Sequence, residues 1–370
     1  MRRASARFAL VDVALKIWRY DPESGERELR EYEVDAPEWA CLLDVLDLIK
    51  DKHDGSLAYR KSCRMMICGS CGMRMDGRAV LACKERMKPI ADAGHVPVIS
   101  AMGNLPVLKD LVVDMAPFWN KIRAVKPWLD PGYDEVAEKE RIVSQQQVNV
   151  INKESLCIMC GCCVSECNSM ESDPEFLGPA ALAKGFRFVG DVRDHGEVAR
   201  LNELNQDHGI WDCTRCYFCN ERCPKGVDPR DAIAKLGAES IKLNIDHDMG
   251  AKHAKWFVKS AETTGWLRET ELVPKTQGIV SSIKEMKFAM GLAVKGKVPP
   301  PFPPHVAKDV KEARALHDLV RTQGREGAAG IVQGEHALAK LSHGYEEGRD
   351  PYGPGSFPRP YLPGEQEGAE

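Results

Sequence analysis

The chain has 370 residues, of which 43% are hydrophobic, so it is long enough for two or three domains of ordinary size. Its formal net charge is −4 and its acidic and basic residues are interspersed, which gives no sign of a nucleic-acid partner. It contains no run of about 18 or more apolar residues, which excludes an ordinary membrane-spanning helix.

Residues 8–105 have the pattern of a small α/β domain. The stretch 11–17 alternates apolar and polar residues, as a half-buried strand does, and "LREYEV" can return as its partner. Residues 38–52 change to helical spacing, and "MRMDGRAVLAC" predicts a hairpin that turns at Asp-Gly. We therefore expect a β-grasp ferredoxin domain, which makes the fold class α+β.

Four cysteines fall in this first domain, and their spacing predicts one metal cluster. The spacing is C-x4-C-x2-C, with the fourth cysteine after eleven further residues, which is the plant-type [2Fe–2S] pattern. Gly69 and Gly72 lie in the same loop and would let backbone N–H groups approach the sulfur atoms. The expected ligands are Cys63, Cys68, Cys71 and Cys83.

Residues 106–150 form a connecting segment between two cysteine-rich parts of the chain. The stretch "VLKDLVVDMAPFWNKI" is amphipathic and predicts a helix up to Pro117. The later stretch "KPWLDPGYDE" has the composition of a loop.

Residues 151–245 contain two runs with the spacing C-x2-C-x2-C-x3-C, which is typical of bacterial ferredoxins. In that pattern three cysteines wrap one cubane cluster, and the fourth ligates the other cluster. The first predicted cubane site, site A, is Cys157, Cys160, Cys163 and Cys223. The second, site B, is Cys167, Cys213, Cys216 and Cys219. Cys162 and Cys41 fall outside both patterns, and we interpret them as small buried thiols.

The surroundings of these two runs predict an α-helical domain. "GPAALAKGFRF" and "PRDAIAKLGAESIK" have helical spacing, and we expect the clusters, rather than a large apolar core, to clamp these helices. Residues 246–370 contain no cysteine and form a C-terminal extension. Within it, 297–304 is a proline-rich spacer and 306–320 has the spacing of an amphipathic helix. The last residues are rich in Pro, Gly and Glu, and we expect them to be extended over a partner or disordered.

Two other uses of cysteine fit this sequence less well than clusters do. Disulfides are disfavoured because a chain of this size rarely needs them. Zinc sites also use C-x2-C pairs, but these pairs are usually separated by a dozen or more residues. His195 and His208 have no ligand-like spacing. We find no nucleotide-binding fingerprint and no catalytic triad, so the chain reads as an electron carrier without bond-making chemistry of its own.

This arrangement resembles the iron–sulfur subunit of succinate dehydrogenase and fumarate reductase. The stretches that carry the resemblance are "KSCRMMICGSCGMRMDGRAVLAC", "NLPVLKDLVVDM", "DPEFLGPAALAKGFRF" and "CPKGVDP", and it covers about residues 8–240. The resemblance implies a partner flavoprotein whose FAD interconverts succinate and fumarate, and membrane anchor subunits, with haem as one option, that bind quinone. It also implies a peripheral position on the cytoplasmic side of the inner membrane.

The chain departs from the common family pattern at positions near site B. Cys216 stands where the family often has an apolar residue and a [3Fe–4S] cluster, so its presence favours [4Fe–4S] over [3Fe–4S]. Asn168 replaces a proline, and Thr214 stands where a histidine is common. The stretch "NSMESDPEF" lacks the tryptophans that many members place beside the quinone. These departures favour menaquinone over ubiquinone.

Two alternatives stay open at this point. The tail stretches "HAKWFVKSAETTGWLRETEL" and "MGLAVKGKVPPPFPP" resemble iron–sulfur subunits of the heterodisulfide-reductase group and of non-classical succinate dehydrogenases. The chain could then belong to a soluble fumarate reductase or heterodisulfide-reductase-like complex that exchanges electrons with thiols or a protein carrier. A cluster-based sensor is a third reading, but no effector module is visible.

Overall fold

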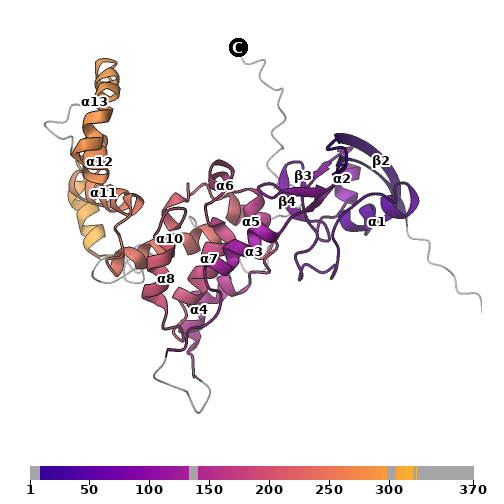
Figure 1. Ribbon diagram of the computed structural model, residues 1–370, viewed down its shortest axis with the longest axis horizontal. Helices are drawn as coiled ribbons and strands as arrows, with labels where there is room; N and C mark the ends of the chain where they lie inside the picture. The colour runs from indigo at the N-terminus through magenta and orange to yellow at the C-terminus, as the bar shows by residue number, and fades with distance from the viewer. Residues whose placement is uncertain (1–8, 133–140, 298–305, 320–321, 323–370) are drawn as a thin grey trace, which may run out of the picture. The chain divides into compact units, whose positions relative to one another are not determined.

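A computed structural model describes residues 9–132, 141–297, 306–319 and 322 (Figure 1). The chain divides into two compact units, residues 1–248 and 249–370, which we describe separately. The predicted α+β fold class is confirmed, because the first unit begins with a mixed sheet and continues as a helical region.

The first unit begins with a five-stranded sheet in the order β2-β1-β5-β3-β4. Its strands are β1 (Leu10–Tyr20), β2 (Arg27–Pro37), β3 (Gly72–Met75), β4 (Arg78–Leu81) and β5 (Val98–Ser100). The predicted hairpins are present: β1 pairs with β2 and β3 pairs with β4, both antiparallel, while β5 joins β1 in parallel. The second hairpin turns at Asp76 and Gly77, whose φ angles of 51° and 75° are those a tight hairpin turn requires.

Helix α1 (Leu42–Lys52) begins four residues later than the sequence predicts. Its N-cap is Cys41, whose backbone N–H donates to the Asp44 carboxylate at 3.0 Å. Leu42, Leu46 and Ile49 are fully buried and belong to the core beside the sheet. Cys41 is therefore a buried capping residue, as expected of a cysteine outside the cluster patterns. A short helix, α2 (Lys88–Asp92), follows the second hairpin.

The helix predicted up to Pro117 is wrong. A small hairpin, β6 (Val107–Lys109) and β7 (Val112–Val113), stands there, and helix α3 (Ala116–Ala124) begins where the prediction ends. Asp110 makes the turn with a φ of 49°, and its carboxylate accepts from the buried Arg19 at 2.9 Å. Pro117 lies in the first turn of α3, where its missing N–H costs nothing.

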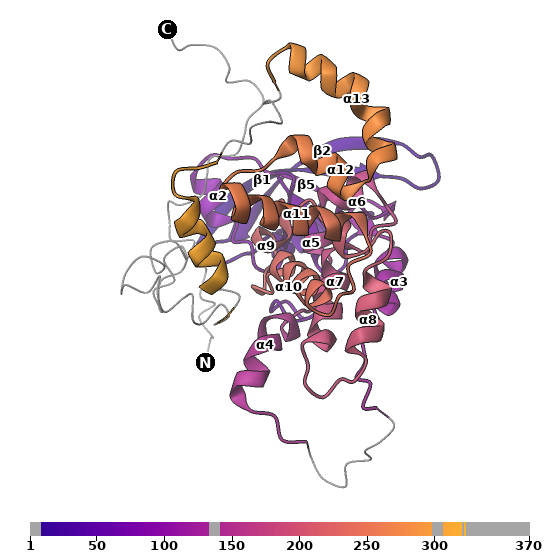
Figure 2. The ribbon, with the colours of Figure 1, turned by 90° about the vertical axis from the view of Figure 1, so that its left-hand side faces the viewer.

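The helical region of the first unit surrounds one central helix. Its helices are α4 (Gln145–Ser155), α5 (Cys162–Ser165), α6 (Asn168–Ser172), α7 (Gly178–Val189), α8 (Glu197–Leu204), η1 (Ile210–Asp212), α9 (Phe218–Glu221) and α10 (Pro229–Lys242). Helix α7 packs against α3, α4, α5, α8 and α10, and Figures 1 and 2 show it beside α10. Leu182 is fully buried, as is nearly every residue around it on α7. The expectation that clusters would replace an apolar core is therefore wrong, because α7 supplies such a core.

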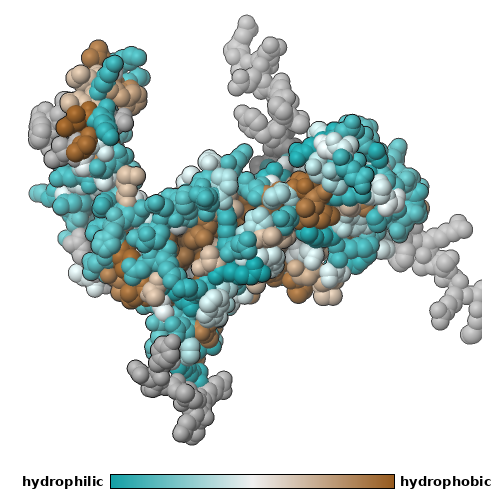
Figure 3. Space-filling model, viewed as in Figure 1, coloured by the Kyte–Doolittle hydropathy of each residue, from teal (hydrophilic) through white to brown (hydrophobic). Residues whose placement is uncertain are grey.

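The second unit contains α11 (Met249–Thr264), α12 (Glu269–Thr276), α13 (Ile279–Val294) and a further helix at 310–319. The last of these lies within the helix predicted at 306–320, with Val310 buried. The apolar side chains of α13 are largely exposed, as the brown atoms in Figure 3 show. Within the described ranges, no helix is both long and apolar enough to cross a bilayer. Most of the proline-rich spacer and the last 48 residues lie outside the described residues.

Candidate metal centres

The first predicted cluster loop folds so that backbone N–H groups point at sulfur. Cys63 Sγ accepts from the N–H groups of Met65, Ile67 and Cys68 at 3.4, 3.3 and 3.3 Å. Cys68 Sγ accepts from the N–H groups of Cys63 and Ser70, each at 3.5 Å. Hydrogen bonds from Ser70 and from Cys63 lower the pKa of the Cys68 thiol to about 6. The loop is thus built to hold thiolates, which are the form that binds metal.

The other two cysteines of this group stand at the open end of the β3–β4 hairpin. Cys71 precedes β3 and Cys83 follows β4, and the N–H of Ala82 donates to the Cys71 carbonyl at 3.1 Å. Burial raises the pKa of Cys71 to about 12, and the neighbouring Cys83 and Cys68 thiolates act in the same direction. The structure therefore brings this set of four sulfur atoms together.

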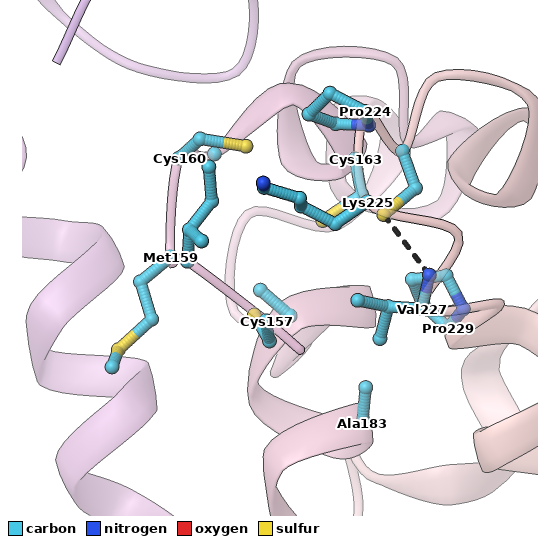
Figure 4. Close-up of a pocket in the computed structure, with 13 residues that line it drawn as sticks. Cys157, Met159, Cys160, Cys163, Ala183, Pro224, Lys225, Val227 and Pro229 are labelled. Carbon is cyan, nitrogen blue, oxygen red and sulfur yellow. Dashed lines mark hydrogen bonds between the residues drawn. The ribbon is translucent and has the colours of Figure 1, made fainter. Parts of the chain in front are cut away.

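Site A is a cavity in the helical region, and all four of its predicted cysteines line it (Figure 4). Three come from the first run, of which Cys163 lies in α5, and Cys223 follows α9 from the later run. Cys223 Sγ accepts from the Val227 N–H at 3.4 Å, the dashed line in Figure 4. Burial raises the pKa of Cys163 well above its ordinary value, and the surrounding thiolates add to the rise. A cationic cluster would remove this cost by neutralising the thiolates, so the donor set fits one.

Site B is a second cavity, and again all four predicted cysteines line it. Here the crossing cysteine is Cys167, which the short helix α5 carries away from the first run. Burial raises the pKa of Cys219 to about 12, with Cys213 and Cys167 as the next causes. Cys216 also lines this cavity, but unlike its neighbour Cys219 it is exposed to solvent.

The two cubane loops repeat the same backbone turn. Two residues after the first cysteine, Met159 and Arg215 have φ of 54° and 58°. Two residues further on, Gly161 and Tyr217 have φ of 81° and 68°. Left-handed residues at matching positions let each loop curl around its cavity, although tyrosine adopts this conformation at a cost.

Cys162 does not line site A and belongs to the apolar core of the sheet domain. It is fully buried there, which agrees with its interpretation as a non-ligand thiol. It also hydrogen-bonds the Cys160 sulfur, and this bond lowers the pKa of Cys160 to about 7.

The loop of the first cluster touches the loop of site A. Gly69, with a φ of 71°, leaves so little space that a methyl group on it would lie 2.7 Å from Cys160 Cβ. A methyl group on Gly72 would lie 3.2 Å from the Cys160 carbonyl oxygen. From the sequence we predict a different role for these two glycines, which is to let backbone N–H groups approach the sulfur atoms. Their close contact with site A could not be predicted from spacing.

A set of polar residues that the sequence did not single out holds the two domains together around α5. The Arg74 guanidinium donates to the Ser165 hydroxyl and to the Glu166 carboxylate at 3.0 Å each, and to the Ser165 carbonyl. The Asn104 side chain donates to the carbonyls of Val164 and Cys167 at 2.8 and 3.0 Å. Helix α5 connects site A to Cys167 of site B, so these bonds fix both sites relative to the sheet domain.

The residues that depart from the family pattern lie at site B. Ser169 and Thr214 line the cavity, and the Thr214 N–H donates to the Ser169 hydroxyl at 3.1 Å. His208, which has no ligand-like spacing, hydrogen-bonds Asp173 at 2.7 Å and lies near Asp212. Asp173 raises the pKa of His208.

Two domain families match the chain. A "2Fe-2S iron-sulfur cluster binding domain" matches residues 14–120, and a "4Fe-4S dicluster domain" matches residues 154–227. The chain thus has a [2Fe–2S] domain followed by a domain for two cubane clusters.

Curated relatives and a solved structure extend this likeness. The fumarate reductase iron–sulfur subunit of Haemophilus influenzae is 40% identical over 240 residues, which are 62% of this chain and 93% of the relative. The 8-methylmenaquinol:fumarate reductase iron–sulfur subunit of Wolinella succinogenes is 30% identical over 315 residues, 83% of this chain and 98% of the relative. The match to the Wolinella succinogenes relative is longer than the first unit, which ends at residue 248, so it extends into the second unit. The Mycobacterium smegmatis Sdh1 complex in the apo form contains a chain 26% identical, with a TM-score of 0.56, covering 65% of this chain and 99% of that one.

Proposed function

The chain belongs to the iron–sulfur subunits of fumarate reductase and succinate dehydrogenase, and on that premise we propose that it relays electrons between the FAD of a partner flavoprotein and a menaquinone. It is the electron-transfer subunit of such an oxidoreductase complex. Its partners are the flavoprotein and a membrane anchor. The clusters supply one-electron chemistry when bound, and the chain holds them in order.

The ligand assignment is part of this proposal. The [2Fe–2S] cluster takes Cys63, Cys68, Cys71 and Cys83. The cubane at site A takes Cys157, Cys160, Cys163 and Cys223, and the cubane at site B takes Cys167, Cys213, Cys216 and Cys219. The single observation that carries the assignment is that each cubane cavity is lined by three cysteines of one run and the fourth of the other.

The contacts between loops support a fixed sequence of electron transfer. Gly69 follows the ligand Cys68 and touches the ligand Cys160, so only one through-space step separates the two ligand sets. Cys163 at site A and Cys167 at site B are joined by α5. The order is therefore [2Fe–2S], site A, site B, with the sheet domain facing the flavoprotein.

Site B has the features expected of the quinone end. Cys216 is exposed, and the side chains of Tyr217 and Phe218 beside it are 45% and 40% exposed. The Wolinella succinogenes relative is named for a methylated menaquinol, which supports menaquinone here. We place the chain on the cytoplasmic side of the membrane, held by its partner subunits.

The experiment purifies the chain together with its native partners and assays succinate oxidation with a menaquinone analogue and with a ubiquinone analogue. We expect faster turnover with the menaquinone analogue and loss of quinone reduction when the anchor is removed, with flavin-dependent dye reduction retained. Turnover with a thiol–disulfide couple but with neither quinone would contradict the proposal.

A further inference from the structure

A cleft opens to solvent beside site A. Its lining comes from α3, the turn after it, the end of α4, and the second half of α7. The lining residues are Trp119, Ile122, Arg123, Pro127, Ser155, Met159, Lys184, Arg187 and Phe188. Met159 lines both this cleft and site A, and in Figure 4 its side chain points away from the cysteines. One side chain therefore separates the cleft from the cavity of a cluster.

The cleft is positively charged. Among the residues that the structure describes, three cations line it and no carboxylate does. Arg187 is bonded to Asp191 at 2.6 Å, but Arg123 donates only to the neutral Asn120 side chain at 3.2 Å. Within the described part of the chain, no ion pair involves Arg123 or Lys184. The charge of Lys184 reaches Cys157, where it opposes the rise in pKa that burial causes.

The cleft also offers apolar contact. Trp119 is 38% exposed and packs edge-on against the buried Phe118, with ring centroids 5.1 Å apart. The Arg187 guanidinium lies over the Phe188 ring at 5.0 Å. A small ligand usually needs a more enclosed pocket, whereas an open apolar patch with a cationic rim suits a protein that carries carboxylates.

We propose that this cleft is a docking site for an acidic one-electron carrier protein, which delivers electrons directly to site A. The inference rests on the proposed function, because site A must hold a cluster. One electron leaves the reduced carrier and reduces the oxidised cluster, and no covalent bond forms or breaks. Interfaces between electron-transfer proteins are small and are steered by charge, so two uncompensated cations beside an exposed tryptophan suffice. The complex would then have an electron entry that bypasses the flavoprotein.

The test uses a plant-type [2Fe–2S] ferredoxin of strongly negative net charge as the probe carrier. The reduced ferredoxin is mixed with the oxidised whole complex, and freeze-quench EPR follows the arrival of electrons at the cubane clusters. Arg123→Glu should slow this reaction about tenfold at low ionic strength. The difference should vanish in about 1 M salt, where the screening length falls to roughly 3 Å. Trp119→Ala should slow the reaction at both salt concentrations.

The matched control is Lys52→Glu, which makes the same change in net charge on α1 of the sheet domain. It should leave the rate within about twofold of the unchanged complex. Equal effects of Arg123→Glu and Lys52→Glu would overturn the docking site while leaving the electron relay intact. If the cubane signals were missing from the unchanged complex, the proposed function itself would fail. Iron content, measured for each variant, separates a docking defect from a loss of clusters.

Discussion

The two cubane loops have the same backbone turn but different surroundings. In the loop of site A the left-handed position is Gly161, and Cys160 is pressed against Gly69 of the sheet domain. In the loop of site B the same position is Tyr217, and Cys216, the counterpart of Cys160, is exposed. A repeated cysteine motif is thus packed against the sheet domain in one place and exposed to solvent in the other.

The contrast indicates that the residues between the cysteines, and not the cysteine spacing, decide how each loop is packed. Gly161 is followed by Cys162, which anchors its loop in the core of the sheet domain. Tyr217 is followed by the exposed Phe218, and its ring lies under the Arg230 guanidinium at 4.4 Å. The loop of site B is therefore held from its own domain and keeps its outer face open.

Replacing Cys216, the exposed cysteine at site B, should have the largest effect, because it should change the cluster itself. We expect Cys216→Val to convert site B from a four-iron to a three-iron cluster, so that this chain holds nine cluster irons instead of ten. Iron analysis and EPR of the oxidised complex measure this. Cys162→Ala is the control, because that thiol is buried outside the cavity, and it should keep ten irons. An unchanged spectrum in Cys216→Val would rule out Cys216 as a ligand.

Separating the loops of the first cluster and site A should have the next largest effect. Gly69→Ala would force its methyl group against Cys160 and push the two loops apart. Because the rate of electron tunnelling falls with distance, we expect electron transfer from the [2Fe–2S] cluster to site A to slow, and freeze-quench EPR measures this.

Gly77→Ala is the matched control, because Gly77 has a similar φ of 75° but no atom within 4 Å of the added methyl group. It should cost about 1 kcal/mol of stability through backbone strain and leave the transfer rate unchanged. If both variants slowed the transfer equally, the close contact at Gly69 would not set the rate.

Weakening the bonds around α5 should have a moderate effect on stability. Arg74→Met keeps the length of the side chain but removes the guanidinium bonds to the Ser165 carbonyl and to Glu166, which keeps only the Ser165 hydroxyl as a hydrogen-bond donor. We expect a loss of about 2 kcal/mol in the free energy of unfolding, the cost of losing hydrogen bonds to a charged group. Thermal unfolding of the cluster-loaded chain measures it. A change below about 0.5 kcal/mol would show that Arg74 contributes little to holding α5.

Substituting Gly161 or Tyr217, the second left-handed residue of each cubane loop, should have the smallest effect on stability. Gly161→Ala adds a side chain where φ is 81°, and we expect it to cost about 1–2 kcal/mol. Tyr217→Gly relieves that strain but removes the ring under Arg230, so we expect a change within about 1 kcal/mol. Denaturant unfolding compares the two. A larger loss in Tyr217→Gly than in Gly161→Ala would mean that the aromatic contact, and not the turn, holds the loop of site B.

Much of the candidate site could be predicted because its signals are local. The cysteines of each loop are three to five residues apart, and the Asp76–Gly77 turn needs only its own φ angles. The hairpin at 107–113 could not be predicted, because "VLKDLVVD" suits a helix as well as a strand. What decides it is Asp110, whose partner Arg19 lies 91 residues earlier.

The residues that hold the two domains together were missed for the same reason. Arg74 and Ser165 are also 91 residues apart, and neither belongs to a recognisable motif. Asn104 has a φ of 58° and lies in a loop without regular structure. Its role depends on the carbonyls at the end of α5, which are distant in sequence, so no local pattern indicates it. From the sequence we underestimated the apolar core around α7, because we assigned the packing of these helices to the metal clusters.

The most direct test of the account is EPR on the native complex, isolated without oxygen, before and after succinate is added. We predict that the oxidised sample shows no three-iron signal, because Cys216 completes a four-iron cluster at site B. We also predict that succinate produces the signal of a reduced [2Fe–2S] cluster. A three-iron signal would contradict the role of Cys216, and clusters that all stay oxidised with succinate would contradict the proposed electron relay.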